Sequence, residues 1–487
     1  MLRQLTDQSI SYAAFVTKRA RPAQKGSDPG SDPAPGYLHS MSEMRPGAET
    51  RRFGRTASLL SAGVGTAGVL TYLFFSLASH NLDATDYGEI VVLWSAVFVS
   101  ISVAYRPVEQ LLSRTLADRI ARGEETGPAI RTAARIQLGV SLVLGIAILL
   151  ARDPLQDGLL SGSETLYWVL FASIATFGAS FFARGYLGGT RQFTLLAALL
   201  VAESAARTLF AFALALGIAE GQTAVALGVA AAPLITLSLV PLLVVLRTRG
   251  DGAEEAQAKP VSLAAGGGFA GAVLVIMVGE QAFLNAGPLL VRAFDDAAAA
   301  GFIFNVLMVV RAPVLIFQGV SASLLPHLTR MRAHGGEDAF HASIRSTLIA
   351  VGAFAAVVFV VVVAVGPTAM QIAFGDRFSY DRPALAIMAV GMGFYLAATT
   401  LSQAALARGA AATAARSWAL AAAAFLVWCL VPVIEDEARR IEIGFAVGAL
   451  LLALFLARAY RQAPGKGMEP DSPDEVEARL AALDEGA

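Results

Sequence analysis

Apolar runs of roughly 20 residues recur twelve times along the chain, and this recurrence limits the fold more than any other feature. A run of that length crosses a hydrocarbon core of about 30 Å as a helix. Hydrophobic residues fill 56% of the 487 positions and charged residues 15%, an average that water-soluble proteins rarely sustain. Because backbone groups in lipid must bond within each segment, and the runs lack the alternation of barrel strands, we predict an all-α polytopic membrane protein.

The second six runs repeat the first six. Gly88 and Gly301, Leu111 and Leu324, and Gly123 and Gly336 are each 213 residues apart. Two six-helix repeats related by an axis along the membrane normal form one known transporter architecture, with a path between the halves. The predicted spans are 56–79, 88–112, 132–151, 164–188, 193–217, 224–246, 263–292, 301–325, 346–366, 383–407, 413–433 and 441–459.

The loops between these spans alternate in charge, which predicts their sidedness. One set is basic: Arg51, Arg52, Arg55, Arg114, Arg119, Arg122, Arg131, Arg135, Arg191, Arg247, Arg249, Lys259, Arg330, Arg332, Arg345, Arg416, Arg458, Arg461 and Lys466. The other set is acidic or mixed: Asp83, Asp86, Asp153, Asp157, Glu220, Asp295, Asp296, and Glu435 to Glu437 followed by Arg439 and Arg440. By the positive-inside rule the basic loops and both termini are cytoplasmic.

These patterns divide the chain into five segments. We predict a disordered cytoplasmic N-terminal tail (1–52), an N-lobe with spans 1–6 (53–247), a cytoplasmic linker (248–262), a C-lobe with spans 7–12 (263–460) and an acidic cytoplasmic C-terminal tail (461–487). The first tail is polar and rich in Pro, Gly, Ser and Arg, a composition that cannot build a core. Since Met41 and Met44 are alternative starts, it stays open whether residues 1–40 belong to the mature protein.

The sequence holds no constellation for catalysis. It lacks a Walker A motif for ATP hydrolysis, and its five histidines have no metal-ligand spacing. The lone cysteine, Cys429, has no partner for an internal disulfide. We therefore expect no enzyme activity, no cofactor, no metal site and no nucleic-acid partner.

Three hairpin segments carry a resemblance to a known family. They are 77–88 (LASHNLDATDYG), 184–193 (RGYLGGTRQF) and 374–378 (FGDRF, with Phe378 near where Tyr is usual). Residues 53–460 are similar to the multidrug/oligosaccharidyl-lipid/polysaccharide (MOP) flippase superfamily, and within it to the oligosaccharide flippases, or polysaccharide biosynthesis membrane proteins. The lipid II flippase carries two further C-terminal helices, and none follows Tyr460, which favours the twelve-helix oligosaccharide branch.

The resemblance implies two bundles that alternate between inward-open and outward-open states in a bacterial plasma membrane. The cargo would be a polyprenyl-(pyro)phosphate-linked oligosaccharide, flipped from the inner to the outer leaflet for surface polysaccharide assembly. Its partners would be that lipid-linked oligosaccharide, membrane lipids, and a polysaccharide polymerase or glycosyltransferases. Two alternatives are a multidrug-type cation antiporter of the same superfamily and a non-transporting scaffold of a glycan-synthesis complex. The sugar, carrier lipid, coupling ion and oligomeric state stay open.

Four ionisable residues lie near the middle of predicted spans: Arg207, Glu203, Arg311 and Glu280. Such a group costs about 2.5–3.5 kcal/mol at the bilayer centre and normally faces a cavity or a partner. We expect Arg207 and Arg311 to bind the phosphates of the substrate, because guanidinium grips phosphate at two points. The structural alternative is that Glu203 neutralises Arg207 along its helix and Glu280 neutralises Arg311 across helices.

Span 7 combines polar residues with helix-breaking ones. Glu280, Gln281 and Asn285 are candidate substrate-binding residues, and Glu280 is also a candidate site for a coupling H⁺ or Na⁺. The candidate hinge residues are Gly279, Gly287 and Pro288. Because Pro288 removes a helix hydrogen bond and the glycines loosen the backbone, we expect a kinked or broken helix there.

A third group lies toward the cytoplasmic end of span 2. Arg106, Glu109 and Arg114 are candidates for a gate or a headgroup contact, and the alternative is a structural pair that snorkels to water. Arg184 and Arg408, at the inner ends of spans 4 and 10, are interpreted as positive-inside anchors.

Overall fold

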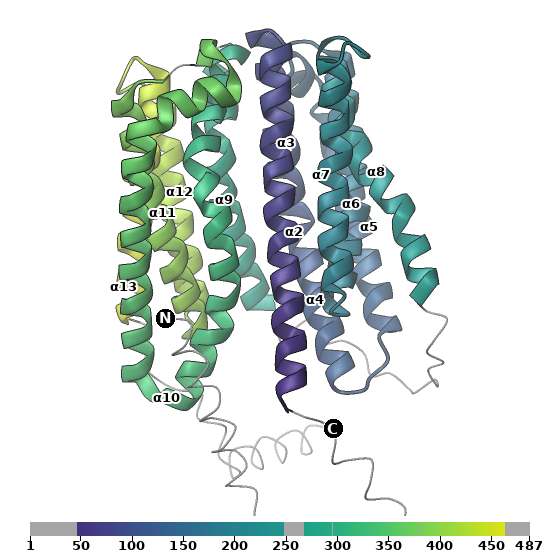
Figure 1. The fold of residues 1–487 in the computed structure, drawn as a ribbon, viewed down its shortest axis with the longest axis vertical. Helices are drawn as coiled ribbons and strands as arrows, with labels where there is room; N and C mark the ends of the chain where they lie inside the picture. The colour runs from purple at the N-terminus through teal and green to yellow at the C-terminus, as the bar shows by residue number, and fades with distance from the viewer. Residues whose placement is uncertain (1–45, 248–266, 295, 379, 463–487) are drawn as a thin grey trace, which may run out of the picture. The chain divides into compact units, whose positions relative to one another are not determined.

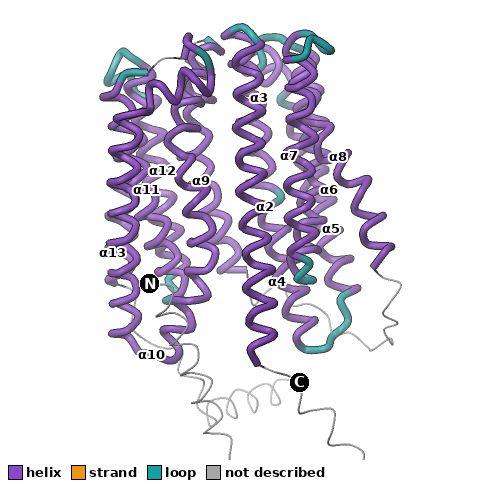
Figure 2. The backbone as a smooth tube through the Cα atoms, in the orientation of Figure 1, coloured by secondary structure: helices purple, strands orange, loops and turns teal. Residues whose placement is uncertain are grey.

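The computed structural model describes residues 46–247, 267–294, 296–378 and 380–462. Over these residues every regular element is a helix (Figure 1), and short loops join the helices (Figure 2). The elements are α2 (Pro46–Asn81), α3 (Ala84–Ala104), α4 (Arg106–Ala121), α5 (Gly127–Leu150), η1 (Pro154–Leu159), α6 (Glu164–Gly189), α7 (Phe193–Ala215), α8 (Gly221–Arg247), α9 (Gly267–Phe294), α10 (Ala297–Phe374), η4 (Asp376–Phe378), α11 (Arg382–Ala407), α12 (Ala411–Leu430) and α13 (Glu437–Gln462).

The helices account for the predicted membrane spans. Ten stretches of the described residues are long and apolar enough to cross a membrane. Two shorter apolar helices, Gly221–Leu234 and Ala297–Ala312, fall where spans 6 and 8 are predicted. The prediction of an all-α multi-pass membrane protein is thus confirmed, with every predicted span matched by helix.

One helix, α10, contains two of the predicted spans. Its 78 residues would extend about 117 Å if straight, far beyond a bilayer. However, Ala297 at its start lies against Gly88, and Gly375 just after its end lies near His80. Because His80 and Gly88 flank the short turn between α2 and α3, both ends of α10 lie on one side. The chain therefore doubles back within α10 and crosses twice, with helix where a loop was expected.

The predicted duplication is visible in how the paired helices begin. Asp83 caps α3 by accepting a hydrogen bond from the Asp86 amide at 2.8 Å, and Asp296 caps α10 by accepting one from the Ala299 amide at 2.8 Å. These two aspartates are also 213 residues apart. Each aspartate accepts a hydrogen bond from an amide that has no partner inside its helix. The corresponding helices of the two repeats therefore begin with the same type of N-terminal cap.

Two of the spans that contain proline, predicted spans 2 and 7, show how a proline affects its helix. Predicted span 2 (88–112) is divided at Tyr105 into α3 and α4, with Pro107 in the first turn of α4. Proline fits that position because its missing N–H would have no partner there. Predicted span 7 was expected to be kinked or broken, and it is not broken: α9 is helical from Gly267 to Phe294 with Pro288 inside it. A kink at Pro288 stays a prediction. Of these two predicted spans, only span 2 is interrupted.

Parts of the predicted segment scheme lie outside the described residues. These parts are most of the N-terminal tail (1–52), the linker (248–262) and most of the C-terminal tail (461–487). At their edges, α2 already begins at Pro46 and α13 ends at Gln462. Helix α2 therefore starts before the predicted boundary at residue 53.

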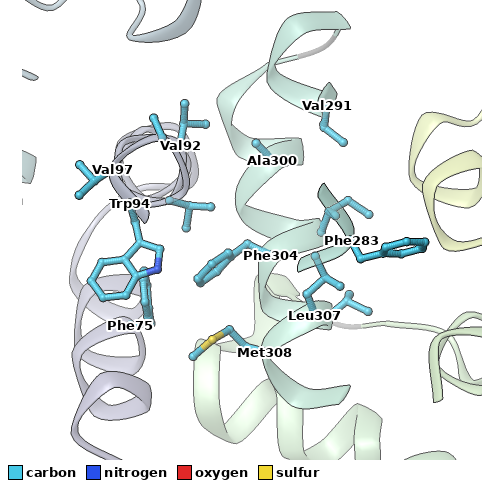
Figure 3. Close-up of a cluster of buried hydrophobic side chains, with 14 of the residues drawn as sticks. Phe75, Val92, Trp94, Val97, Phe283, Val291, Ala300, Phe304, Leu307 and Met308 are labelled. Carbon is cyan, nitrogen blue, oxygen red and sulfur yellow. The ribbon is translucent and has the colours of Figure 1, made fainter. Parts of the chain in front are cut away.

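Helix α3 joins the two repeats. It packs on α9 and α10 of the second repeat and on α6 and α8 of the first. Figure 3 shows Phe75 and Trp94 on one side of this contact and Phe304 and Met308 on the other. The Phe75 ring centroid lies 5.0 Å from that of Trp94 and 4.6 Å from that of Phe304. In a membrane protein such close side-chain packing, and not removal from water, stabilises helix association.

The repeats also meet at the end that carries the acidic loops, which we call the outer end following the charge asymmetry. There Gly88 lies so close to α10 that an added Cβ would be 1.8 Å from the Ala297 carbonyl oxygen. Its repeat counterpart Gly301 faces it, with its ideal Cβ 3.2 Å from the Gly88 Cα. The halves are therefore in contact at their outer ends.

Hydrogen bonds reinforce this outer contact. The Tyr87 hydroxyl bonds the Asn305 side chain, and the Arg377 guanidinium donates to the carbonyls of Ser79 and Leu82. Arg292 Nη2 donates to Ser161 Oγ at 3.0 Å. Each bond joins one repeat to the other, so opening toward this side requires breaking several of them.

Candidate functional site

Glu203 and Arg207 share a face of α7, but Glu203 pairs with a different arginine. Arg184 Nη2, on α6, donates to both oxygens of the Glu203 carboxylate at 2.8 and 2.9 Å. Ser180 Oγ, also on α6, donates to Glu203 Oε2 at 2.9 Å. The side chain of Glu203 is 3% exposed and that of Arg184 is 15% exposed. Arg184, interpreted from sequence as a surface anchor, is thus one half of a buried ion pair.

Arg207 is buried without an acidic partner at hydrogen-bonding distance. It is 3% exposed, and its guanidinium lies 4.5 Å from the Trp94 ring centroid and 6.0 Å from that of Phe74. Its Nη2 makes a long hydrogen bond of 3.4 Å to Ser204 Oγ. Among the described residues, its Nε and Nη1 have no hydrogen-bond partner. Aromatic faces stabilise such a cation by about 0.5–2 kcal/mol but leave its N–H donors open to an anion.

The Arg184–Glu203 pair lies close to two of the predicted gate residues. Helices α4 and α6 approach closely at Gly185, whose ideal Cβ would be 2.8 Å from the Glu109 carbonyl oxygen. This approach brings Glu109 within electrostatic range of Arg184, Glu203 and Arg106. Arg106 and Glu109 are half-buried, whereas Arg114 is exposed further along α4. The structure therefore joins Arg106 and Glu109 to the interior charges.

Arg311 has a role that the sequence did not reveal. Its Nη1 donates to the Leu284 carbonyl oxygen at 3.1 Å. In a regular helix that carbonyl would accept from the amide of residue 288, but residue 288 is proline and has no N–H. Arg311 therefore satisfies the acceptor that Pro288 leaves free, which explains how α9 stays helical around it. A guanidinium carries five N–H donors, so this bond uses one of them.

Glu280, on α9, lies within electrostatic range of Arg311, as do the hydroxyls of Tyr72 and Tyr395. Glu280 is half-buried. Tyr72 belongs to the first repeat and its hydroxyl donates to the Met308 carbonyl of α10. The structure thus brings Arg311 and Glu280 into one neighbourhood at the contact between the repeats.

The remaining candidates of span 7 contribute to packing and to an internal hydrogen bond. Asn285 Nδ2 donates to Gln281 Oε1 at 2.7 Å, and each residue is 6% exposed. Gly279 packs against Trp418, and Gly287 lies against Ile441, Ile303 and Leu307. Substrate binding by Gln281 and Asn285, hinge motion at Gly279, Gly287 and Pro288, and ion coupling at Glu280 stay predictions.

A series of aromatic contacts runs from Arg207 to the second repeat. The Arg207 guanidinium contacts the Trp94 ring. Trp94 contacts Phe75, which in turn contacts Phe304 on α10 (Figure 3). Sequence reasoning missed Trp94 and Arg184 as parts of this site, because an aromatic residue or an arginine near a helix end carries no local sign of its partner. In the part of the chain that the structure describes, no group of three His, Cys, Asp or Glu residues could hold a metal ion.

Sequence comparison gives distant relatives. No family model matches the chain. It is 25% identical over 350 residues to the uncharacterized protein Rv3630 of Mycobacterium tuberculosis, covering 68% of this chain and 76% of the relative. The uncharacterized protein Mb3654 of Mycobacterium bovis matches with the same identity and coverage.

Comparison of structures is more informative about the fold. The eukaryotic MATE transporter AtDTX14 matches with a TM-score of 0.64 and 13% identity, covering 90% of this chain and 98% of that one. An inward-facing multidrug resistance MATE family transporter of the MOP superfamily matches with a TM-score of 0.61 and 13% identity, over 86% and 96% of the two chains. A point mutant of the Vibrio cholerae MATE transporter VcmN matches with a TM-score of 0.55 and 15% identity, covering 85% of this chain and 98% of that one. The fold is therefore that of the MATE transporters of the MOP superfamily, as the hairpin resemblance implied.

Proposed function

We propose that the chain is a membrane transporter that flips a phosphate-bearing, lipid-linked oligosaccharide from the inner to the outer leaflet of a bacterial plasma membrane by alternating access. The observation that carries this proposal is Arg207. It is a guanidinium inside the membrane-spanning bundle, 3% exposed, whose neighbouring carboxylate already belongs to Arg184. An isolated buried charge is unfavourable, so a cation kept in this state is matched to an anion that arrives and leaves.

The charges of the candidate site also favour an anionic cargo. Among the ionisable residues of the site described above, the cations are Arg106, Arg184, Arg207 and Arg311 and the carboxylates are Glu109, Glu203 and Glu280, which leaves one net positive charge. Phosphate and pyrophosphate match guanidinium geometry through paired hydrogen bonds. A cargo headgroup could therefore replace water at Arg207 and Arg311 during passage.

The proposed cycle follows from the contacts that close the outer end. Rocking the repeats apart there separates Phe75 from Phe304 and breaks the Tyr87–Asn305 bond. Trp94 contacts Phe75, so the packing around Trp94 changes when Phe75 separates from Phe304. Movement of Trp94 would expose Arg207 while the cargo is between leaflets, and return of Trp94 would compete with the bound phosphate.

A multidrug-type cation antiporter is the second candidate, and Glu280 favours it. A half-buried carboxylate within electrostatic range of Tyr395 suits a cationic cargo or a coupling ion. The two candidates differ in which side chain carries transport. The flippase depends on Arg207, whereas the antiporter depends on Glu280.

The experiment measures both activities in the same proteoliposomes. Flipping of a fluorescent polyprenyl-pyrophosphate oligosaccharide is followed by quenching from outside, and cation export by loss of a cationic dye. For the flippase we expect Arg207→Gln to lower the flipping rate at least tenfold, roughly the loss of one charge-assisted hydrogen bond. Arg152→Gln removes an arginine whose side chain is 45% exposed at the outer end and serves as the matched control with unchanged flipping.

Each outcome assigns one function. Loss of flipping in Arg207→Gln, with an unfolding temperature close to the parent's, supports the flippase. Unchanged flipping, with dye export lost in Glu280→Gln, would show the antiporter. A parent protein that moves neither compound while folded favours the scaffold.

Arg311 needs a paired variant because it holds a carbonyl as well as facing the interior. Arg311→Gln alone should destabilise the protein by about 1–3 kcal/mol, since the Leu284 carbonyl loses its donor. In Pro288→Ala the amide of residue 288 can bond that carbonyl, so adding Arg311→Gln in this background should cost much less stability. If flipping stays low in the double variant while thermal unfolding is restored, Arg311 acts on cargo. If flipping returns together with stability, Arg311 is structural only.

A further inference from the structure

Five ionisable residues of the first repeat form one charge cluster across α4, α6 and α7. Its members are Arg106, Glu109, Arg184, Glu203 and Arg207, and each lies within electrostatic range of at least one other member. Since three arginines face two glutamates, at least one guanidinium lacks a carboxylate of its own whichever pairs form. In this conformation Arg207 is such a guanidinium, because Glu203 bonds Arg184.

Glu203 lies between two arginines that it can bond in turn. It precedes Arg207 by four residues on α7, which is the favourable order and spacing for a glutamate and a cation on one helix. The Arg207 guanidinium already folds back toward this turn, because its Nη2 donates to Ser204 Oγ at 3.4 Å. Its Nε and Nη1 have no hydrogen-bond partner among the described residues. Rotation of the Glu203 side chain would therefore give Arg207 a carboxylate from its own helix.

Arg184 has a second carboxylate beside it. Helices α4 and α6 touch at Gly185, whose ideal Cβ would be 3.1 Å from the Glu109 Cα. Glu109 lies within electrostatic range of Arg184. The Nε of Arg184 is buried and has no hydrogen-bond partner in the part of the chain that the structure describes. Arg184 can therefore pass from Glu203 to Glu109 and remain paired.

We propose that these residues exchange ion-pair partners. In the arrangement seen here, Glu203 bonds Arg184 and leaves Arg207 to an anion. In the second arrangement, Glu203 bonds Arg207 and Glu109 bonds Arg184. The guanidinium without a carboxylate is then Arg106, which is half-buried, in place of Arg207, which is 3% exposed. The exchange thus neutralises the more deeply buried charge, which is the more costly one to leave alone.

An anion at Arg207 decides which arrangement is populated. The first arrangement has three hydrogen bonds to the Glu203 carboxylate, two from Arg184 and one from Ser180. An anion bound at Arg207 favours it further, because the negative charge repels Glu203. When the anion leaves, attraction between Arg207 and Glu203 favours the second arrangement. Glu203 is therefore an internal anion that competes with a bound phosphate and promotes its release.

This inference deepens the proposed function and rests on it in one respect, since the anion at Arg207 is taken to be the phosphate of the cargo. The exchange of partners itself needs no cargo, because all five charged groups belong to the chain. It is therefore tested first without any substrate, so that its failure and a failure of flipping are separate results.

The first experiment measures thermal unfolding of the full chain in neutral detergent. If Glu203 moves to Arg207, Arg184→Met should lower the unfolding temperature much less than Glu203→Gln does. Adding Arg207→Met to Arg184→Met should then cause a large further loss, because Glu203 has no cation left, whereas Arg207→Met alone should cause little loss. Adding Arg207→Lys instead keeps a cation beside Glu203 and should retain most of the stability.

Two results of this experiment would overturn the proposal. One is a loss from Arg184→Met as large as that from Glu203→Gln, including failure of Arg184→Met to fold. The other is additivity of Arg184→Met and Arg207→Met, because independent effects mean that Glu203 does not transfer between the two arginines.

The second experiment follows the kinetics of flipping in proteoliposomes. Glu109→Gln removes the alternative partner of Arg184, so Glu203 stays in place and cargo leaves Arg207 slowly. We expect kcat to fall severalfold with KM equal to the parent's or lower. Arg184→Met holds Glu203 on Arg207, so we expect KM to rise severalfold.

Glu164→Gln is the matched control, because the Glu164 side chain is 67% exposed at the outer end. Its kcat and KM should equal those of the parent. Equal KM values in Glu109→Gln and Arg184→Met would contradict partner exchange even if both variants flip the cargo. If the parent flips nothing, the proposed function fails, and the unfolding measurements still decide whether the partners exchange.

Discussion

At the scale of single residues, the interior arginines divide according to what each guanidinium already bonds. Arg184 is neutralised by Glu203, and Arg311 replaces the amide that Pro288 lacks. Among the residues that the structure describes, Arg207 contacts aromatic rings and makes one long hydrogen bond. From sequence alone all three are simply arginines in apolar helices. Their different partners make Arg207 the residue most available to a cargo.

The Arg184–Glu203 pair gives a stability prediction. Glu203→Gln leaves the Arg184 charge without its partner inside the protein, so we expect a loss of about 3–5 kcal/mol in the free energy of unfolding. Adding Arg184→Met to this variant should recover most of the loss, because no unpaired charge remains. Chemical unfolding of the purified variants measures both values.

The control for this prediction is an exposed ion pair in the same fold. Arg152 and Glu164 lie 3.3 Å apart with side chains 45% and 67% exposed. Glu164→Gln should therefore cost at most about 1 kcal/mol. A loss from Glu203→Gln no greater than that from Glu164→Gln would contradict a buried structural pair.

At the scale of helices, the effect of a proline depends on what lies beside it. In the first repeat Pro107 is at the start of α4, and the chain breaks at Tyr105. In the second repeat Pro288 sits inside an unbroken α9, because Arg311 reaches across from α10 to the Leu284 carbonyl. The sequence shows where each proline lies in a predicted span. Whether the proline interrupts its helix depends on the contacts made by the neighbouring helix.

The crossing of α3 and α10 gives a second prediction. A methyl group on Gly88 would overlap the Ala297 carbonyl oxygen, so Gly88→Ala should push the outer ends of these helices apart. In a Cys429→Ala background, a cysteine at Ala300, which is 0% exposed, reports the change. We expect a membrane-impermeant maleimide to label this cysteine several times faster when Gly88→Ala is present.

Gly139 provides the comparison, since its ideal Cβ meets nothing within 4 Å. Gly139→Ala should leave the labelling rate at position 300 unchanged. Equal labelling in the Gly88 and Gly139 variants would show that the close glycine contact does not hold the outer end shut.

At the scale of the whole molecule, the two repeats are in contact at their outer ends, through matched glycines and through hydrogen bonds between side chains and backbone. A transporter that works by alternating access must break these contacts once per cycle. The same contacts therefore identify where a covalent link would stop the cycle.

A cross-link at the outer end gives the third prediction. Ser161 and Arg292 are joined by a 3.0 Å hydrogen bond between the repeats. With Cys429→Ala, cysteines at these two positions and a reducible bifunctional thiol reagent should abolish flipping in proteoliposomes, and reduction should restore it. Each single-cysteine variant treated alike should stay active. Full activity of the linked protein would rule out separation of the repeats at this point.

The amino-acid sequence by itself determined the fold class, the number of crossings and the duplication. These features depend on local length, apolarity and a repeated offset, all of which are properties of the chain read in order. Residues such as Asp83 and Asp296 cap their helices as a local rule predicts.

Only the tertiary structure decided the partners of the interior charges. Glu203 has Arg207 one turn away on its own helix, yet it bonds Arg184 on α6, and Arg311 bonds a carbonyl 27 residues earlier in the chain. The continuity of α9 and the contact of the buried Arg207 with Trp94 follow from the same cause. Each depends on which helices pack side by side, and spacing along one helix carries no information about its neighbours.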